Sequence, residues 1–507
     1  MAGGYVNKVV VLIQGLVLIP LYLYFIGDRM YGLWLASGGV LTWLAFMDMG
    51  IGNLLIQRVS SSYGRQDYKL TADYFMNGIL VYAVLAVVFY ILVFVLSFFI
   101  ADWFGAKGED ASLLRLCFQL AGIAAGGEFL NNCLRGFSQA LLRPLFPMIC
   151  MVGFRILGLL VIVFLLYQNY GLLAIPMGLL FMAIPVLILN GYYSVRLIRE
   201  LSINWNISKN IILDFFRLGP YLLISRIGNS MVRNIEPILI AIILRPEWVP
   251  VFVITRRAAD MLVQFLRVID ASTFPSFAHL YAEGNFKSSQ YAVSKIMTLI
   301  FSAGLIGFGT YVAGNRSFVY LWVGPEKFLG QGATLLMGLA LLMMFIKELL
   351  SRFIIGMGDI IYPSVLTFAE AVSRVFLMVT LLYGIGLIGL PLGMLISCLI
   401  FMWFFYKRLN KKLPMTFLKE WHWVRLFMLL IVIFWIGFLV AQKVQVFETW
   451  FQWGRYVFLF ANLLLIFNLL LNPALRSLFV DSFIPLFKKP IVKKAHVNFV
   501  PKNLYDL

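Results

Sequence analysis

Residues 215–279 decide the fold and read FFRLGPYLLISRIGNSMVRNIEPILIAIILRPEWVPVFVITRRAADMLVQFLRVIDASTFPSFAH. The stretch is long and apolar enough for two membrane-spanning helices of roughly 20 residues each. A charge in hydrocarbon is costly unless it is paired or faces water. Outside the short connection between the two spans, nine charged residues nevertheless interrupt the stretch, namely Arg217, Arg226, Arg233, Glu236, Arg256, Arg257, Asp260, Arg267 and Asp270. This set predicts a hydrated, positively charged path through a membrane.

The composition of the whole chain supports a membrane protein. Of its 507 residues, 62% are hydrophobic and only 13% are charged, against roughly 25% charged in average soluble proteins. No hydrophilic block is long enough for a separate soluble domain, so catalysis outside the membrane is not expected. Four cysteines and three histidines are scattered without ligand-like spacing, so neither a disulfide framework nor a metal site is predicted.

Apolar windows predict an all-α polytopic protein with about 14 transmembrane helices. The windows fall at 5–26, 31–56, 74–100, 112–135, 144–167, 171–193, 213–244, 249–279, 291–313, 329–355, 361–383, 387–406, 422–441 and 455–472. Cations gather in alternate connections, which the positive-inside rule interprets as cytoplasmic, together with both termini. The net charge of +18 is therefore largely a topology signal, and no nucleic-acid partner is expected.

Two pairs of segments indicate an internal repeat. GLLAIPMG at 171–178 returns as GLIGLPLG at 386–393, and the spacing of Tyr63 and Tyr68 returns in Tyr281 and Phe286. Six spans separate equivalent helices, and an even number predicts parallel repeats with a site between them. The expected parts are an N-terminal six-helix bundle (1–200), a C-terminal one (208–410), two extra spans (420–472) and a basic tail (473–507).

Helical spacing collects the charges of residues 215–279 on two faces. One face holds Arg226, Asn229, Arg233 and Glu236, and the other holds Arg256, Asp260, Gln264 and Arg267. Mutual salt bridges could explain single residues: Asp260 with Arg256 or Arg257, Asp270 with Arg267, and Glu236 with Arg233. Arginine outnumbers the acids, however, and its fork suits phosphate or carboxylate. The predicted substrate-binding residues are Arg226, Arg233, Arg256, Arg257 and Arg267.

Other intramembrane charges allow further expectations. Asp48, Glu128, Glu236 and Asp260 are candidates for gating or for coupling to H⁺ or Na⁺. Glu370 and Arg374 are predicted to form a bridge within one helix, because they are four residues apart. Lys347, Glu348 and Arg352 lie near the inner end of the span at 329–355 and are expected to reach toward the membrane surface. No bound cofactor is predicted.

A family resemblance rests on FIGDRMYGLW at 25–34 and FMDMGIGN at 46–53. These segments resemble the first two spans of Wzx-type polysaccharide flippases, through Gly27, Tyr31, Gly32, Asp48 and Gly50. The two-half plan with two extra spans is similar to the multidrug/oligosaccharidyl-lipid/polysaccharide (MOP) exporter superfamily. The resemblance implies a V-shaped pair of bundles that opens a cationic cavity alternately to either side of a bacterial inner membrane.

The implied cargo is an undecaprenyl-pyrophosphate-linked oligosaccharide, such as an O-antigen or other surface-polysaccharide repeat unit. A polysaccharide polymerase and a chain-length regulator are further partners that the resemblance suggests. Three alternatives stay open: a flippase for the peptidoglycan precursor, a drug or cation antiporter, and a membrane polymerase, ligase or glycosyltransferase. An antiporter would be expected to favour an acidic cavity. An enzyme usually needs a sizeable outer loop, and the longest one expected here, Gly314–Phe328, has about 15 residues.

Overall fold

The computed structural model describes residues 2–44, 47, 51–201, 206–216, 228, 235–414, 420–444, 446–473 and 475–476. Within these ranges the regular structure is helical, with no strand. Eight helices of the described part are long and apolar enough to cross a membrane. The predicted all-α, multi-pass membrane fold is confirmed.

The first half of the chain consists of seven α-helices and one short 3-10 helix in the described ranges. They are α1 (Ala2–Ile26), α2 (Asp28–Leu44), α3 (Ile51–Gly64), α4 (Tyr68–Trp103), α5 (Glu109–Ala140), α6 (Leu145–Tyr167), η2 (Gly171–Leu173) and α7 (Ala174–Leu201). The window predicted at 31–56 thus corresponds to two helices, α2 and α3. Asp48 lies outside the described residues, between them.

The second half begins with the span predicted at 213–244, of which only 213–216, 228 and 235–244 are described. Its helices are α9 (Glu236–Ile243), α10 (Trp248–Ala282), α11 (Phe286–Val323), η3 (Pro325–Lys327), α12 (Gln331–Gly356), α13 (Ile361–Ile385), η4 (Gly386–Ile388), α14 (Gly389–Lys412), α15 (Glu420–Lys443) and α16 (Trp450–Leu471). The outer loop predicted at Gly314–Phe328 is wrong. The apolar end of α11 continues its helix to Val323, where Gly324 ends it with a φ of +103°.

The connection after the second predicted span has the same structure in both halves. Tyr63 and Tyr68 lie with ring centroids 5.8 Å apart, and Tyr281 and Phe286 lie 5.6 Å apart. The next helix begins each time with a side-chain cap, from Asp67 for α4 and from Asn285 for α11. A capping oxygen satisfies one of the free amides at a helix start. The two segments that indicate a repeat in the sequence are therefore also equivalent in geometry.

The second repeated segment is equally regular. Gly171 and Gly386 both have positive φ, +54° and +68°, which glycine adopts without steric cost. Each opens a 3-10 turn, η2 or η4, that leads into the next long helix, α7 or α14. In the first half α7 packs against α5 and α6, and in the second half α14 packs against α12 and α13. This packing confirms the parallel repeat.

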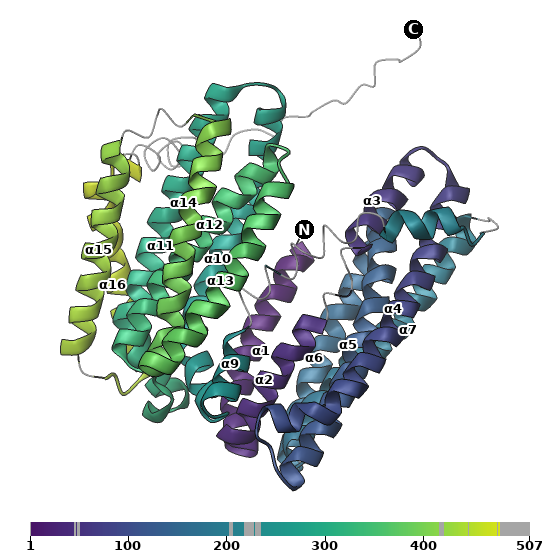
Figure 1. Cartoon of the computed structure of the whole chain (residues 1–507), viewed down its shortest axis with the longest axis horizontal. Helices are drawn as coiled ribbons and strands as arrows, with labels where there is room; N and C mark the ends of the chain where they lie inside the picture. Colours follow the sequence, from purple (N-terminus) through teal and green to yellow (C-terminus); the bar gives the residue numbers. More distant parts are fainter. Residues whose placement is uncertain are drawn as a thin grey trace, which may run out of the picture.

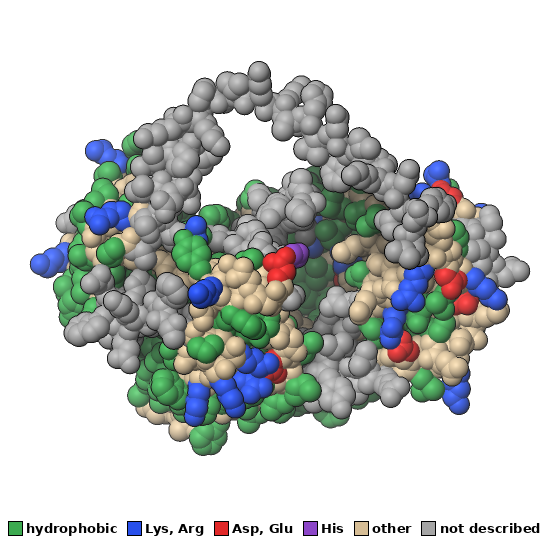
Figure 2. Space-filling model, turned by 90° about the horizontal axis from the view of Figure 1, so that it is seen from above, with side chains coloured by type: hydrophobic (Ala, Val, Ile, Leu, Met, Phe, Trp, Pro, Cys, Tyr) green, Lys and Arg blue, Asp and Glu red, His purple; other side chains and the backbone are tan. Residues whose placement is uncertain are grey.

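The two sets of helices form a V (Figure 1). Helices α1–α7 make one arm and α9–α14 the other, while α15 and α16 lie on the outer side of the second arm, against α11. The connections between α3 and α4 and between α10 and α11 lie at the open end. Viewed from that end, the molecule is hollowed between the arms (Figure 2). The hollow is where the parallel repeat predicts a site.

The arms are joined by polar contacts at the closed end of the V. Lys327 Nζ of η3 lies 2.5 Å from a carboxylate oxygen of Asp28 on α2. Trp322 donates its indole N–H to the carbonyl of Leu16 on α1 at 2.9 Å. Arg29 and Glu247 add a longer ion pair of 3.9 Å. These contacts hold the first arm to the second at this end, so separating the arms here requires breaking them.

Candidate functional site

A cavity of about 220 Å³ lies on the second arm, among α9, α10, α12 and α14. Five of the nine predicted site residues line it together: Glu236, Arg256, Arg257, Asp260 and Arg267. Glu128 is elsewhere, in a cavity of the first arm. Arg226, Arg233 and Asp48 lie outside the described residues. Apolar walls come from α12 and α14 through Leu341, Met344 and Met394.

Arg256 is held between two carboxylates. Its guanidinium lies 3.1 Å from Glu236, at the start of α9, and 3.1 Å from Asp260, one turn further along α10. The Glu236 side chain has no exposed surface, and Arg256 is only 17% exposed. The predicted pairing of Asp260 with Arg256 is confirmed. Because two acids share one arginine, Arg256 in this state is already neutralised before any ligand arrives.

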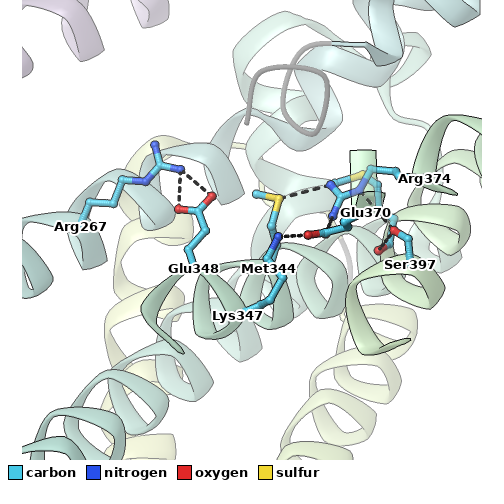
Figure 3. Close-up of polar contacts among 8 residues, drawn as sticks. Arg267, Met344, Lys347, Glu348, Glu370, Arg374 and Ser397 are labelled. Carbon is cyan, nitrogen blue, oxygen red and sulfur yellow. Dashed lines mark hydrogen bonds and ion pairs between the residues drawn. The ribbon is translucent and has the colours of Figure 1, made fainter. Parts of the chain in front are cut away.

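Arg267, two turns further along the same face of α10, has a partner from another helix. It lies 3.3 Å from the carboxylate of Glu348 on α12, which is 81 residues away in the chain (Figure 3). Glu348 therefore points into the bundle, and the expectation that it reaches toward the membrane surface is wrong. The side chain of Asp270, the other predicted partner, is not described.

A second ionic cluster lies deeper in the arm, beside Arg267 and Glu348 (Figure 3). Glu370 on α13 pairs with Lys347 of α12 and, at 2.6 Å, with Arg374. Arg374 also donates from Nε to the Ser397 hydroxyl on α14 at 3.2 Å. The predicted Glu370–Arg374 bridge is confirmed. The expectation for Lys347 is wrong, because its side chain faces α13 and is 3% exposed.

Arg257 differs from its neighbours. In the described part of the chain it makes no ion pair, and its buried Nε has no hydrogen-bond partner. The guanidinium lies against α1: a Cβ on Gly15 would come within 1.6 Å of Nη2. Only a glycine at position 15 therefore leaves room for Arg257 in this position. The residue belongs to the second arm and reaches the first.

The charge balance of the cavity follows from these contacts. The three guanidinium groups of Arg256, Arg257 and Arg267 are matched in number by three carboxylates, those of Glu236, Asp260 and Glu348. Arg256 pairs with the first two and Arg267 with the third, which comes from α12. The cationic excess counted within residues 215–279 is therefore balanced among the residues described here. Among the described cavity residues, the guanidinium of Arg257 is left without an ion pair. It lies beside Arg256, whose two carboxylate partners a more strongly bound anion could replace.

The described residues include no group of three or more His, Cys, Asp or Glu side chains that could hold a metal ion. All four cysteines are buried and free.

Comparison with known families decides the identity. Residues 3–281, more than half of the chain, match the family described as "Polysaccharide biosynthesis protein". The chain belongs to this polysaccharide biosynthesis family. The match includes the first arm and all five cavity residues named above. A search of curated proteins gave no match.

Solved structures of MOP-superfamily transporters have the same fold. The structure is similar to the lipid II flippase MurJ in an inward closed conformation, with a TM-score of 0.67, 13% identity, and coverage of 95% of this chain and 99% of that one. It is also similar to an inward-facing multidrug resistance MATE transporter, with a TM-score of 0.67, 16% identity, and coverage of 78% and 95%. At these identities the likeness shows the fold.

Proposed function

We propose that this protein is a flippase that moves an undecaprenyl-pyrophosphate-linked oligosaccharide, the repeat unit of a surface polysaccharide, across the bacterial inner membrane. Membership of the polysaccharide biosynthesis family supports a role in making a polysaccharide. The two-armed fold suits a transporter that opens alternately to either side of the membrane. The observation that carries the proposal is Arg257, which lines the intramembrane cavity of the second arm, reaches α1 of the first arm, and has no ion pair with any described residue. A cation in that position is stable when water or an anion faces it.

In this proposal the pyrophosphate binds at Arg257, with Arg256 and Arg267 as further donors. Arginine binds phosphate through two parallel N–H···O bonds. The polyprenyl tail stays in the bilayer, beside the arms. The positive-inside rule assigns the open end of the V to the cytoplasm, so this is an inward-open state. The cargo drives the change of state only by binding the two states differently.

The direct test is mass spectrometry of lipid-linked glycans in membranes from cells that lack this protein. We expect one complete, unpolymerised repeat unit to accumulate on undecaprenyl pyrophosphate and to disappear when the gene is restored. Accumulation of the peptidoglycan precursor instead would assign a different cargo. Unchanged lipid-linked glycans would contradict the proposal.

The contacts at the closed end make a prediction about the balance between the two states. Substituting Lys327→Met removes the ion pair with Asp28, which is half-exposed and stays solvated. Exposed or partly exposed pairs contribute up to about 1 kcal/mol, so we expect up to about a five-fold shift toward the outward-open state. A cysteine introduced at Gln264, in the cavity, should then react faster with a membrane-impermeant maleimide added from outside.

Two further variants complete this measurement. Lys443→Met changes an exposed lysine at the end of α15 and should leave labelling at Gln264→Cys unchanged. The charge exchange Asp28→Lys with Lys327→Asp should restore the slow rate. Equal rates in all variants would show that this ion pair does not hold the outer end closed.

A further inference from the structure

The first arm has a cavity of its own. It is about 470 Å³ in volume, within the roughly 300–1,000 Å³ typical of small-ligand sites. Its lining comes from α2, α5, α6 and α7 and includes Trp34, Thr42, Glu128 and Arg155. A neighbouring cavity shares Met151 with it and continues to Gln139 near the end of α5. Ligands could therefore reach it along the arm.

Arg155 is the chemical centre of this cavity. It is the eleventh of the 23 residues of α6, so about 15 Å of helix separates it from either end. That depth is too great for its charge to reach the membrane surface. In the described part of the chain it makes no hydrogen bond or ion pair. The nearby acid Glu128 is already bound to Arg135 at 2.9 Å and to Asn131 at 3.0 Å.

At the corresponding depth of its helices, the second arm holds paired charges instead. Asn131 and Lys347 each lie nine residues before the end of their helices, α5 and α12. Gly158 and Arg374 are each the fourteenth residue of α6 and α13. In the second arm Lys347 and Arg374 join Glu370 in a buried cluster. At the equivalent positions the first arm has Asn131 and Gly158, neither of which carries a charge.

We propose that the cavity around Arg155 binds an acidic sugar of the glycan, with the Arg155 guanidinium as counter-ion to its carboxylate. One arginine that has no partner among the described residues matches one negative charge, and its fork suits a carboxylate. Glu128, whose side chain is 46% exposed, can accept hydrogen bonds from sugar hydroxyls. Trp34 offers an apolar face for a sugar ring. This inference rests on the proposed function, because it assigns the glycan to one arm and the pyrophosphate to the other.

The test uses the purified full chain and three probes: trigalacturonic acid, neutral maltotriose and undecaprenyl pyrophosphate. We expect the wild type to prefer trigalacturonic acid to maltotriose. Arg155→Gln should weaken binding of the acidic trisaccharide roughly 10- to 100-fold, and Arg155→Lys should recover part of it. Undecaprenyl pyrophosphate should bind all three proteins equally. Arg316→Gln, an exposed arginine of α11 that lines neither cavity, is the matched control.

The outcomes separate the two proposals. If the wild type binds undecaprenyl pyrophosphate but does not distinguish the two trisaccharides, or if Arg155→Gln still distinguishes them, the acidic-sugar site is wrong and the flippase proposal stands. Failure of the wild type to bind undecaprenyl pyrophosphate would count against the flippase. If Arg155→Gln does not fold, the variant Glu128→Gln tests the inference instead. Removing a carboxylate that repels the acidic sugar should tighten the binding of trigalacturonic acid. Unchanged or weaker binding would overturn the inference.

Discussion

Substitution Glu370→Gln is expected to remove most of the folded protein from the membrane. Its carboxylate is shared by Lys347 and Arg374, and all three side chains are nearly inaccessible, at 0–3% exposure. Removing one partner of a buried ion pair typically costs 3–5 kcal/mol, because a charge is left uncompensated. Total stabilities are about 5–15 kcal/mol, so the loss is a large fraction. Size-exclusion chromatography of a fluorescent fusion and the thermal unfolding temperature would measure it.

The control for this experiment is Glu200→Gln, which removes an exposed carboxylate from a pair with Arg143 at the end of α7. It should change little, since exposed pairs contribute up to about 1 kcal/mol. Replacing the cluster as a whole, with Lys347→Met, Glu370→Gln and Arg374→Met together, should recover folded protein, because apolar side chains can replace buried ion networks. Normal stability of the single variant Glu370→Gln would show that the folded protein does not depend on this carboxylate to compensate the charges of Lys347 and Arg374.

The helices and the repeat could be predicted because their signals are local. Hydropathy determines where a chain can cross a bilayer, and the positive-φ glycines at 171 and 386 mark equivalent turns before α7 and α14. The division of the predicted second span into α2 and α3 carries no comparable signal. Nor does the end of α11, where residues after Gly314 are as compatible with helix as with an outer loop.

The candidate site could be predicted only where its partners are close in the chain. Asp260 lies one turn from Arg256, and Arg374 one turn from Glu370, so helical spacing places each pair. Glu348 could not be assigned to Arg267, because the pair forms across two helices 81 residues apart. The pairing of Lys347 with Glu370 could not be predicted for the same reason, because it too joins two helices. Whether such a lysine reaches the membrane surface or a buried acid depends on which face of its helix packs against the neighbouring helix.

Arg257→Gln is expected to abolish most transport while leaving the folded protein intact. No described residue pairs with Arg257, so the substitution removes a buried charge without stranding a partner, and stability should be unchanged or raised. Losing a charged hydrogen-bonding pair with pyrophosphate should reduce transport roughly 10- to 150-fold. Lysine keeps the charge but not the fork, so Arg257→Lys should lie between the two. Transport is read from the accumulated lipid-linked repeat unit, and folding from size-exclusion chromatography.

The neighbouring residue is the matched comparison, because it lies on the same helix and in the same cavity. Arg256→Gln leaves Glu236, which is fully buried, without the guanidinium 3.1 Å away, and should lower the amount of folded protein. A cargo role for Arg257 therefore predicts that the two variants differ in protein level. Arg257→Gln loses transport at a normal level of folded protein, whereas Arg256→Gln loses both transport and folded protein. If both variants lose protein equally, the two arginines are structural. If Arg257→Gln transports normally, the pyrophosphate does not bind there, and a guanidinium without a partner among the described residues needs another explanation.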